Sequence, residues 1–192
     1  MNVQIPRPMD GPAFLAWAEG REGRYELVEG RVIMMTGGSL GHALVVRGLS
    51  NLLDSRLAGT RWIALTSDFA VKIGPNTVRY PDVVVEARGG KLSDLAATVP
   101  VLIAEVLSPS SVTTDLGDKA TEYLHLTGVS AYLVLSQDEP KAWVWVRNES
   151  GFPAGAEVIA GGDGVIGIPL LAIELPLAEI YKDLPTSDGE SE

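Results

Sequence analysis

Cysteine is absent from this chain of 192 residues, and only His42 and His125 are histidines. The lack of cysteine excludes disulfide bonds and thiolate metal sites, and two histidines are too few for a histidine-rich zinc site. No apolar run approaches the ~20 residues that cross a bilayer. The first eight residues lack the basic start and apolar stretch of a signal peptide. We therefore expect a cytoplasmic protein without a membrane partner.

Basic residues are scarce relative to acidic ones. The chain has 15 Lys and Arg against 25 Asp and Glu, and its formal net charge is −10. This balance argues against broad, non-specific adhesion to nucleic acid, which requires cations that neutralise phosphates. It does not exclude a local basic groove.

The length fits one domain, and a hydrophobic fraction of 46% is enough for a real core. We expect a single domain over residues 1–182. Residues 183–192 form a polar segment that contains Asp188, Glu190 and Glu192. We expect this segment to be a disordered acidic tail.

Strand and helix patterns alternate along the chain. The expected helices cover residues 9–19, 40–57 and about 111–126, and the expected strands cover 25–28, 32–35, 61–66, 69–73, 79–85, 101–107, 130–136 and 141–147. Pro109 should end the strand over 101–107, because proline cannot donate to a ladder. The glycine-rich residues 151–168 should form a loop or a short hairpin. The order predicts an α/β or α+β fold with a mixed sheet.

Two of the expected strands each carry one carboxylate in apolar surroundings. Asp82 precedes three valines, and Glu105 lies within the run Val-Leu-Ile-Ala-Glu-Val-Leu. Runs this apolar are typical of strands covered on both faces. A buried, ionised carboxylate is costly unless a cation or a donor meets it. Two of them on neighbouring strands would suit a divalent cation such as Mg²⁺, which prefers oxygen ligands.

Lys119 lies on the helix that follows the strand of Glu105. A lysine near two metal-binding carboxylates could orient or deprotonate a water and offset charge on a phosphate, as metal-assisted phosphodiester hydrolysis requires. Simpler interpretations exist for these residues. Asp82 could cap a turn after Pro81. Lys119 follows Asp115 by four residues, the spacing of a surface ion pair on a helix.

Several short motifs, in order, resemble the Uma2 family. They are Tyr-Glu-Leu-Val-Glu-Gly at 25–30, Tyr-Pro-Asp-Val at 80–83, Glu-Val-Leu-Ser-Pro-Ser at 105–110, Asp-Leu-Gly-Asp-Lys at 115–119, and Tyr123 with Gly-Val at 128–129. The match covers roughly residues 10–150. The resemblance implies a restriction-endonuclease-like fold of the PD-(D/E)xK type, a mixed β-sheet flanked by helices. It also implies a homodimeric DNA endonuclease that depends on Mg²⁺ or Mn²⁺.

The family resemblance assigns roles to particular residues. Asp82 matches the aspartate of the PD element, and Glu105 matches the acidic residue of the (D/E)xK element. Both are implied to be catalytic and to bind the metal. The lysine of that element should stand at position 107, which holds leucine. Uma2 proteins share this departure, and in them a lysine from the next helix is thought to substitute. Lys119 occupies the matching position and is the third implied catalytic residue.

Three further residues have open interpretations. His42 could contact the site or be a partly exposed helix histidine. Glu26 could be an outer ligand of the metal or a solvated edge residue. Tyr123 lies one turn beyond Lys119 on the same helix face, where packing is the simpler role.

Our hypothesis from the sequence is a metal-dependent DNA endonuclease. The main alternative is a catalytically inactive nuclease fold that binds nucleic acid or protein, which the acidic charge and Leu107 favour. A third possibility is a hydrolase of a small phosphorylated molecule, for which a narrow closed pocket would be the sign. A basic groove leading to Asp82 would favour the endonuclease.

Overall fold

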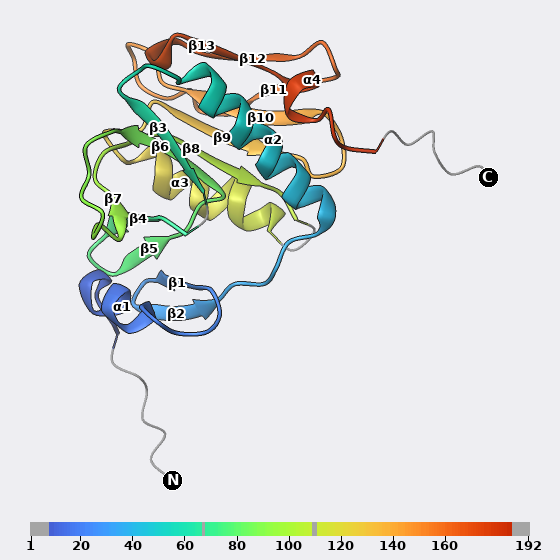
Figure 1. Cartoon of the computed structure of the whole chain (residues 1–192). Coiled ribbons are helices and arrows are strands. Elements are labelled where there is room, and N and C mark those ends of the chain that lie inside the picture. The colour runs from blue at the N-terminus through green and yellow to red at the C-terminus, as the bar shows by residue number, and fades with distance from the viewer. Residues whose placement is uncertain (1–7, 67, 109–110, 186–192) are drawn as a thin grey trace, which may run out of the picture.

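A mixed sheet of six strands forms the centre of the computed structural model, which describes residues 8–66, 68–108 and 111–185 (Figure 1). The strand order is β11-β10-β9-β8-β6-β3. These strands are β3 (Trp62–Thr66), β6 (Val83–Ala87), β8 (Pro100–Val106), β9 (Ala131–Leu135), β10 (Lys141–Val146) and β11 (Glu157–Ala160). β8 and β9 run parallel, and the other neighbours are antiparallel. The predicted mixed α+β fold is therefore confirmed.

A second sheet lies beside the first, with the order β2-β1-β5-β4-β7. Its strands are β1 (Tyr25–Val28), β2 (Arg31–Met34), β4 (Ala70–Gly74), β5 (Thr77–Arg79) and β7 (Ala96–Ala97). Helix α1 (Gly11–Ala18) packs against this sheet. A small pair, β12 (Val165–Ile168) and β13 (Ile173–Pro176), is followed by a short helix, α4 (Leu177–Ile180).

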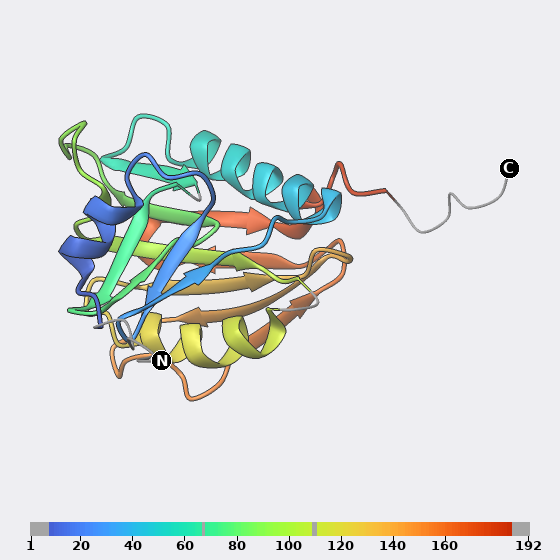
Figure 2. The ribbon, with the colours of Figure 1, turned by 90° about the horizontal axis from the view of Figure 1, so that it is seen from below.

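Helices cover both faces of the six-stranded sheet. Helix α2 (Leu40–Arg56) lies on one face, and α3 (Lys119–Leu124), preceded by a π-helical turn over Thr114–Asp118, lies on the other (Figure 2). Val83 and Val85 belong to the core under α2, while Val84 belongs to the core under α3. Strand side chains alternate between faces, so continuous apolar runs are needed to fill both cores.

Local chemistry explains where several elements begin. Asp10 caps α1 by accepting a hydrogen bond from the Ala13 amide at 2.8 Å, and Ser39 caps α2 through the His42 amide at 3.1 Å. The turn between β1 and β2 has positive φ at Glu29 (49°) and Gly30 (79°). Two successive positive φ angles match the twist of a tight hairpin.

The sequence prediction was wrong in two places that affect the architecture. The single strand expected over 79–85 is divided: β5 ends at Arg79 in the second sheet and β6 begins at Val83 in the first, with Pro81 and Asp82 between them. Proline has no amide to donate, so it interrupts a ladder. The glycine-rich residues 151–168 contain β11 and β12, which belong to different sheets.

Two predicted segments end in residues that the structure does not describe. Pro109 lies outside the described residues. Within the predicted tail, Asp183 pairs with Arg47 at 2.7 Å and Leu184 packs on the core, while residues 186–192 are outside the described part. In the described part of the chain, every helix is too short or too polar to cross a membrane. The cytoplasmic location stays a prediction.

Candidate active site

The two predicted carboxylates lie at the same end of neighbouring strands. β6 and β8 pair antiparallel with Val83 opposite Ala104. Asp82, just before β6, is therefore brought next to Glu105, near the end of β8. Both residues are buried, with exposed fractions of 8% and 3%. The apolar sequence around Asp82 and Glu105 correctly indicated that both carboxylates are buried.

Asp82 is held by the protein through one oxygen. The Val106 amide donates to Asp82 Oδ2 at 2.8 Å, and His42 Nε2 lies 3.2 Å from the same atom. His42 is in the first turn of α2, so the cap at Ser39 also directs this side chain. Among the described residues, both of these contacts with Asp82 are made to Oδ2, so Oδ1 is not engaged by either of them.

Glu105 is held in the same one-sided way. Lys119 Nζ donates to Glu105 Oε1 at 2.9 Å, and the Tyr123 hydroxyl donates to the same oxygen at 3.0 Å. Tyr123 is fully buried and packs on Tyr132, with ring centroids 5.2 Å apart. The simpler prediction for Tyr123, packing, is therefore only part of its role, because its hydroxyl also orients the carboxylate.

Lys119 lies among three carboxylates. Besides Glu105, its ammonium is 3.2 Å from Asp115 Oδ1 and 3.9 Å from Glu26 Oε1. The pair with Asp115 exists, as the spacing predicted, but it is buried and is not a surface pair. Asp115 Oδ1 receives no well-directed hydrogen bond from the described residues. It is close enough to the Lys119 ammonium for electrostatic attraction.

A π-helical turn explains how a lysine on a helix reaches this point. The Lys119 amide donates to the Thr114 carbonyl, five residues earlier, so the turn is wider than an α-turn. Such turns are rare and often occur at functional sites. Lys119 follows directly after this turn, and its ammonium contacts both Asp115 and Glu105. Sequence periodicity did not reveal the turn, since the same residues can form an ordinary α-turn.

Burial sets the protonation of this group of side chains. The pKa of Glu105 is raised from 4.5 to about 8. Desolvation is the largest cause, Lys119 opposes it, and the negative charges of Asp82, Asp115 and Glu26 add to it. Burial alone would lower the pKa of Lys119, but Glu105, Glu26 and Asp115 together raise it above its ordinary value. Lys119 is therefore a cation at neutral pH, and a cation that binds Glu105 must displace a proton.

A second layer of charge lies behind Lys119, and sequence reasoning missed it. Arg79 donates to Glu26 Oε2 at 2.9 Å and holds Glu122 through two bonds of 2.7 and 2.8 Å. Glu26 is only 6% exposed, so its interpretation as a solvated edge residue was wrong. An arginine three residues before Asp82, in an apolar segment, was the available indication.

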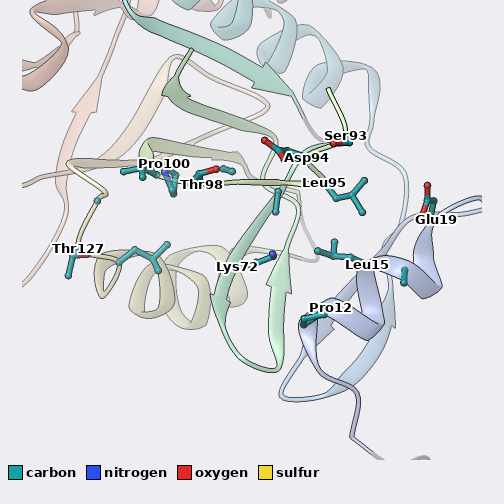
Figure 3. A pocket seen from close by; sticks show the side chains of 16 residues that line it. Pro12, Leu15, Glu19, Lys72, Ser93, Asp94, Leu95, Thr98, Pro100 and Thr127 are labelled. Carbon is teal, nitrogen blue, oxygen red and sulfur yellow. The ribbon is translucent and has the colours of Figure 1, made fainter. Parts of the chain in front are cut away.

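The site opens into a cavity of about 220 Å³. Its walls include His42, Asp82, Glu105, Asp115 and Lys119, with Ile33 and Met34 of β2 at one side. A larger cavity of about 760 Å³ lies elsewhere, between α1, Lys72 and the segment from Ser93 to Pro100 (Figure 3). Among the described residues that line it there is no predicted catalytic residue. The candidate active site is therefore identified by the carboxylates and the lysine that line the smaller cavity, and not by the volume of the cavity.

The donor set fits a hard divalent cation. Mg²⁺ is usually bound through one or two carboxylates and keeps several waters. In the described part of the chain, no three Asp, Glu or His side chains are grouped as a ready metal cage. Asp82 and Glu105, each with one oxygen held by the protein, meet the smaller requirement of Mg²⁺. Asp115 lies beside them, and its Oδ1 is paired with the Lys119 ammonium at 3.2 Å.

The family model described as "Putative restriction endonuclease" matches residues 12–178. This chain belongs to the Uma2 family. Because the match covers most of the chain, the predicted family membership is confirmed. The matched range contains Asp82, Glu105 and Lys119. Two curated proteins of Synechocystis are similar along most of their length. The protein slr1290 is 32% identical over 155 residues, covering 78% of this chain and 80% of the relative. The protein sll1609 is 30% identical over 141 residues, covering 71% and 80%.

A solved structure resembles this Uma2 chain in fold. It is the crystal structure of "a putative nuclease belonging to DUF820" from Anabaena variabilis, and it aligns with a TM-score of 0.72. The alignment covers 91% of this chain and 98% of the other, at 19% sequence identity. At that identity the likeness establishes the shared fold.

Proposed function

We propose that this Uma2 protein is a Mg²⁺-dependent DNA endonuclease, with Mn²⁺ able to substitute. The observation that carries the proposal is the one-sided anchoring of two adjacent carboxylates. Asp82 and Glu105 each have one oxygen fixed by protein donors, and Lys119 contacts the second of them. Family membership and the nuclease description of the solved neighbour support the same class of reaction.

Asp82 and Glu105 would hold the metal, and the backbone carbonyl of Val106 could complete the protein's share of the ligands. When bound, such an ion lowers the pKa of a water and stabilises charge on a phosphate. His42 and the Val106 amide keep the Asp82 carboxylate in one orientation. Tyr123 does the same for Glu105. Ordered carboxylates reduce the reorganisation needed during the reaction.

Lys119 would position the attacking water and stabilise negative charge on the phosphoryl oxygens. Its raised pKa keeps it protonated at neutral pH, so it acts through its positive charge and its hydrogen bonds. The water oxygen forms a bond to phosphorus and gives up one proton to solvent. The bond from phosphorus to the leaving oxygen breaks, and the leaving oxygen takes a proton from solvent. The products are a phosphate monoester end and a hydroxyl end.

The direct test is a plasmid-nicking assay in Mg²⁺ and in chelator. Wild type should convert supercoiled DNA to open circles only with Mg²⁺. Asp82→Asn should lose at least about a hundredfold in rate, because the cation that would stabilise the transition state loses one of its two carboxylate ligands, and should keep its fold by circular dichroism. The matched control is Glu157→Gln on the exposed strand β11. Equal nicking by Asp82→Asn would overturn the assignment.

We also propose that the protein acts as a homodimer, as the resemblance implies. Strand β2 supports this, because it is a sheet edge with exposed apolar residues, including Ile33 (48%) and Met34 (67%). Such edges invite pairing with another chain. Sedimentation velocity should show a dimer for wild type, a monomer for Met34→Lys, and a dimer for Val158→Lys on the other exposed edge, β11. A wild type that remains monomeric at high concentration would contradict the proposal.

The net charge of −10 is the observation that favours the alternative, an inactive nuclease fold with a binding role. In the nicking experiment this alternative predicts no cleavage with either metal. Retention of a protein from solution, or of DNA without cleavage, would then be the activity to measure.

A further inference from the structure

Arg79 is a buried cation whose charge the proposed chemistry does not use directly. It ends β5, three residues before Asp82, and is only 4% exposed. Arginine stays protonated in proteins, and a buried charge is costly unless it is paired. Its partners are therefore required for the fold, and their positions show what Arg79 connects.

The guanidinium joins three separate elements. One edge holds Glu122 of α3 through Nε and Nη2, at 2.7 and 2.8 Å, and Nη1 donates to Glu26 of β1 at 2.9 Å. Two parallel bonds to one carboxylate fix its plane as well as its distance. Arg79 thus links β5, β1 and α3 through short, charged hydrogen bonds.

Both carboxylates that Arg79 holds adjoin Lys119. Glu122 follows Lys119 by three residues on α3, so the two side chains lie on neighbouring positions of one helix face. Glu26 Oε1 is 3.9 Å from the Lys119 ammonium and accepts a hydrogen bond from the Tyr80 amide at 3.1 Å, while Arg79 holds Oε2. A constraint on Glu122 and Glu26 is therefore a constraint on where Lys119 can stand.

Lys119 needs such a constraint because it comes from a helix. A lysine two places after Glu105 would be carried by the same strand, with the sheet ladder fixing its distance. Here the backbone bonds of β8 do not reach α3, and side-chain contacts must set the position of the helix. Catalytic groups have to be held within roughly 0.5 Å of the productive geometry.

We propose that Arg79 is a positioning residue that holds α3, through Glu122 and Glu26, so that Lys119 meets Glu105 and Asp82 in the reactive arrangement. Arg79 and Asp82 lie on one short segment, so the same piece of chain fixes the lysine and supplies a carboxylate. The inference rests on the proposed nuclease function for its kinetic consequence, but its geometric consequence can be measured without any cleavage.

The first variant is Arg79→Lys, which keeps the charge and loses the two-pronged geometry. Its single-turnover nicking rate on supercoiled plasmid, at saturating protein and Mg²⁺, should fall about 10- to 100-fold, the penalty of a misplacement near 1 Å. The Mg²⁺ affinity from calorimetry and the protein concentration for half-maximal rate should not change. Arg56→Lys is the matched control, because Arg56 pairs with Glu179 at the surface.

A second variant keeps the inference testable if Arg79→Lys does not fold. Glu122 is 22% exposed at its side chain, so Glu122→Gln should fold, and it should show a smaller rate loss in the same direction. In a Lys119→Met background, Arg79→Lys should cause no further loss, because it acts through the lysine. An additive loss would mean that Arg79 is only structural, and would overturn the inference.

The geometric consequence is tested by NMR on protein labelled with carbon-13 in its five lysines. The Lys119 side-chain resonance, assigned by its absence in Lys119→Met, should shift in Arg79→Lys while the other four native lysine resonances stay in place. The lysine introduced at position 79 adds a sixth signal, which is assigned in the double variant Arg79→Lys/Lys119→Met. An unmoved Lys119 resonance would overturn the inference. If wild type nicks no DNA but the resonance shifts, the nuclease function fails and the positioning of Lys119 stands. If wild type nicks DNA and Arg79→Lys matches it, only the positioning role fails.

Discussion

Lys119→Met is expected to lose about 10²- to 10³-fold in nicking rate, the effect of removing one transition-state donor. It should also lower the free energy of unfolding of the metal-free protein by about 3–5 kcal/mol, because breaking a buried ion pair leaves uncompensated charge. Glu105, Asp115 and Glu26 all lie within 4 Å of the ammonium that is removed. Kinetics and urea denaturation check the two effects.

The control for this variant is Lys141→Met. Lys141 pairs with Glu139 at 3.4 Å at the surface, so its loss should change stability by less than about 1 kcal/mol. Adding Mg²⁺ should recover part of the stability of Lys119→Met, because a cation again faces the carboxylates. A Lys119→Met protein as stable and as active as wild type would refute the role of this lysine.

Glu105→Gln is expected to change how stability depends on pH. Because the pKa of Glu105 is raised from an ordinary 4.5 to about 8, the folded protein retains a proton that the unfolded chain has released. Between about pH 5 and 8 the wild-type free energy of unfolding should fall as pH rises, by up to about 1.4 kcal/mol per pH unit at full slope. Glutamine does not titrate, so the variant lacks this loss.

Urea denaturation in chelator, at intervals from pH 5 to 8.5, checks the difference between the two proteins. Wild type should lose stability relative to Glu105→Gln across this window. Glu157→Gln, at an exposed position of β11, should follow wild type throughout. Parallel profiles for wild type and Glu105→Gln would show that Glu105 is not a buried, protonated group.

The pairing of Asp82 with Glu105 could be predicted because the sequence around each is unusual. Valines after Asp82 and the apolar run around Glu105 fill two cores, one on each face of the six-stranded sheet. Hydrophobic pattern therefore identified both the strands and the residues that interrupt them.

The surroundings of Lys119 could not be predicted in the same way. Arg79 stands close to Asp82 in a largely apolar segment, but Glu122 and Glu26 are ordinary charged residues in the sequence, and nothing local shows that the three are buried together. Their contacts join positions 43 to 53 residues apart, which periodicity cannot reveal. Asp115 was correctly paired with Lys119 by its spacing, but the π-helical turn that buries the pair has no sequence pattern of its own.

The division of the strand near Asp82 was missed for a related reason. Residues 79–85, Arg-Tyr-Pro-Asp-Val-Val-Val, were predicted as one strand because three valines follow Asp82, and Pro81 was the indication of a break. The structure assigns β5 and β6 to different sheets, and Asp82 lies in the link between them. This link places the Asp82 carboxylate beside the cavity. A strand that continued from residue 79 to residue 85 would not require that position.

The most direct measurement is calorimetric titration of Mn²⁺ and Mg²⁺ at pH 8.5, where Glu105 is ionised, with plasmid nicking on the same samples. The proteins are wild type, Asp82→Asn, Glu105→Gln and the control Glu157→Gln. We predict metal binding and nicking by wild type and the control, and the loss of both in the Asp82 and Glu105 variants. A wild type that binds neither metal, or variants that bind it as wild type does, would contradict the metal site at Asp82 and Glu105.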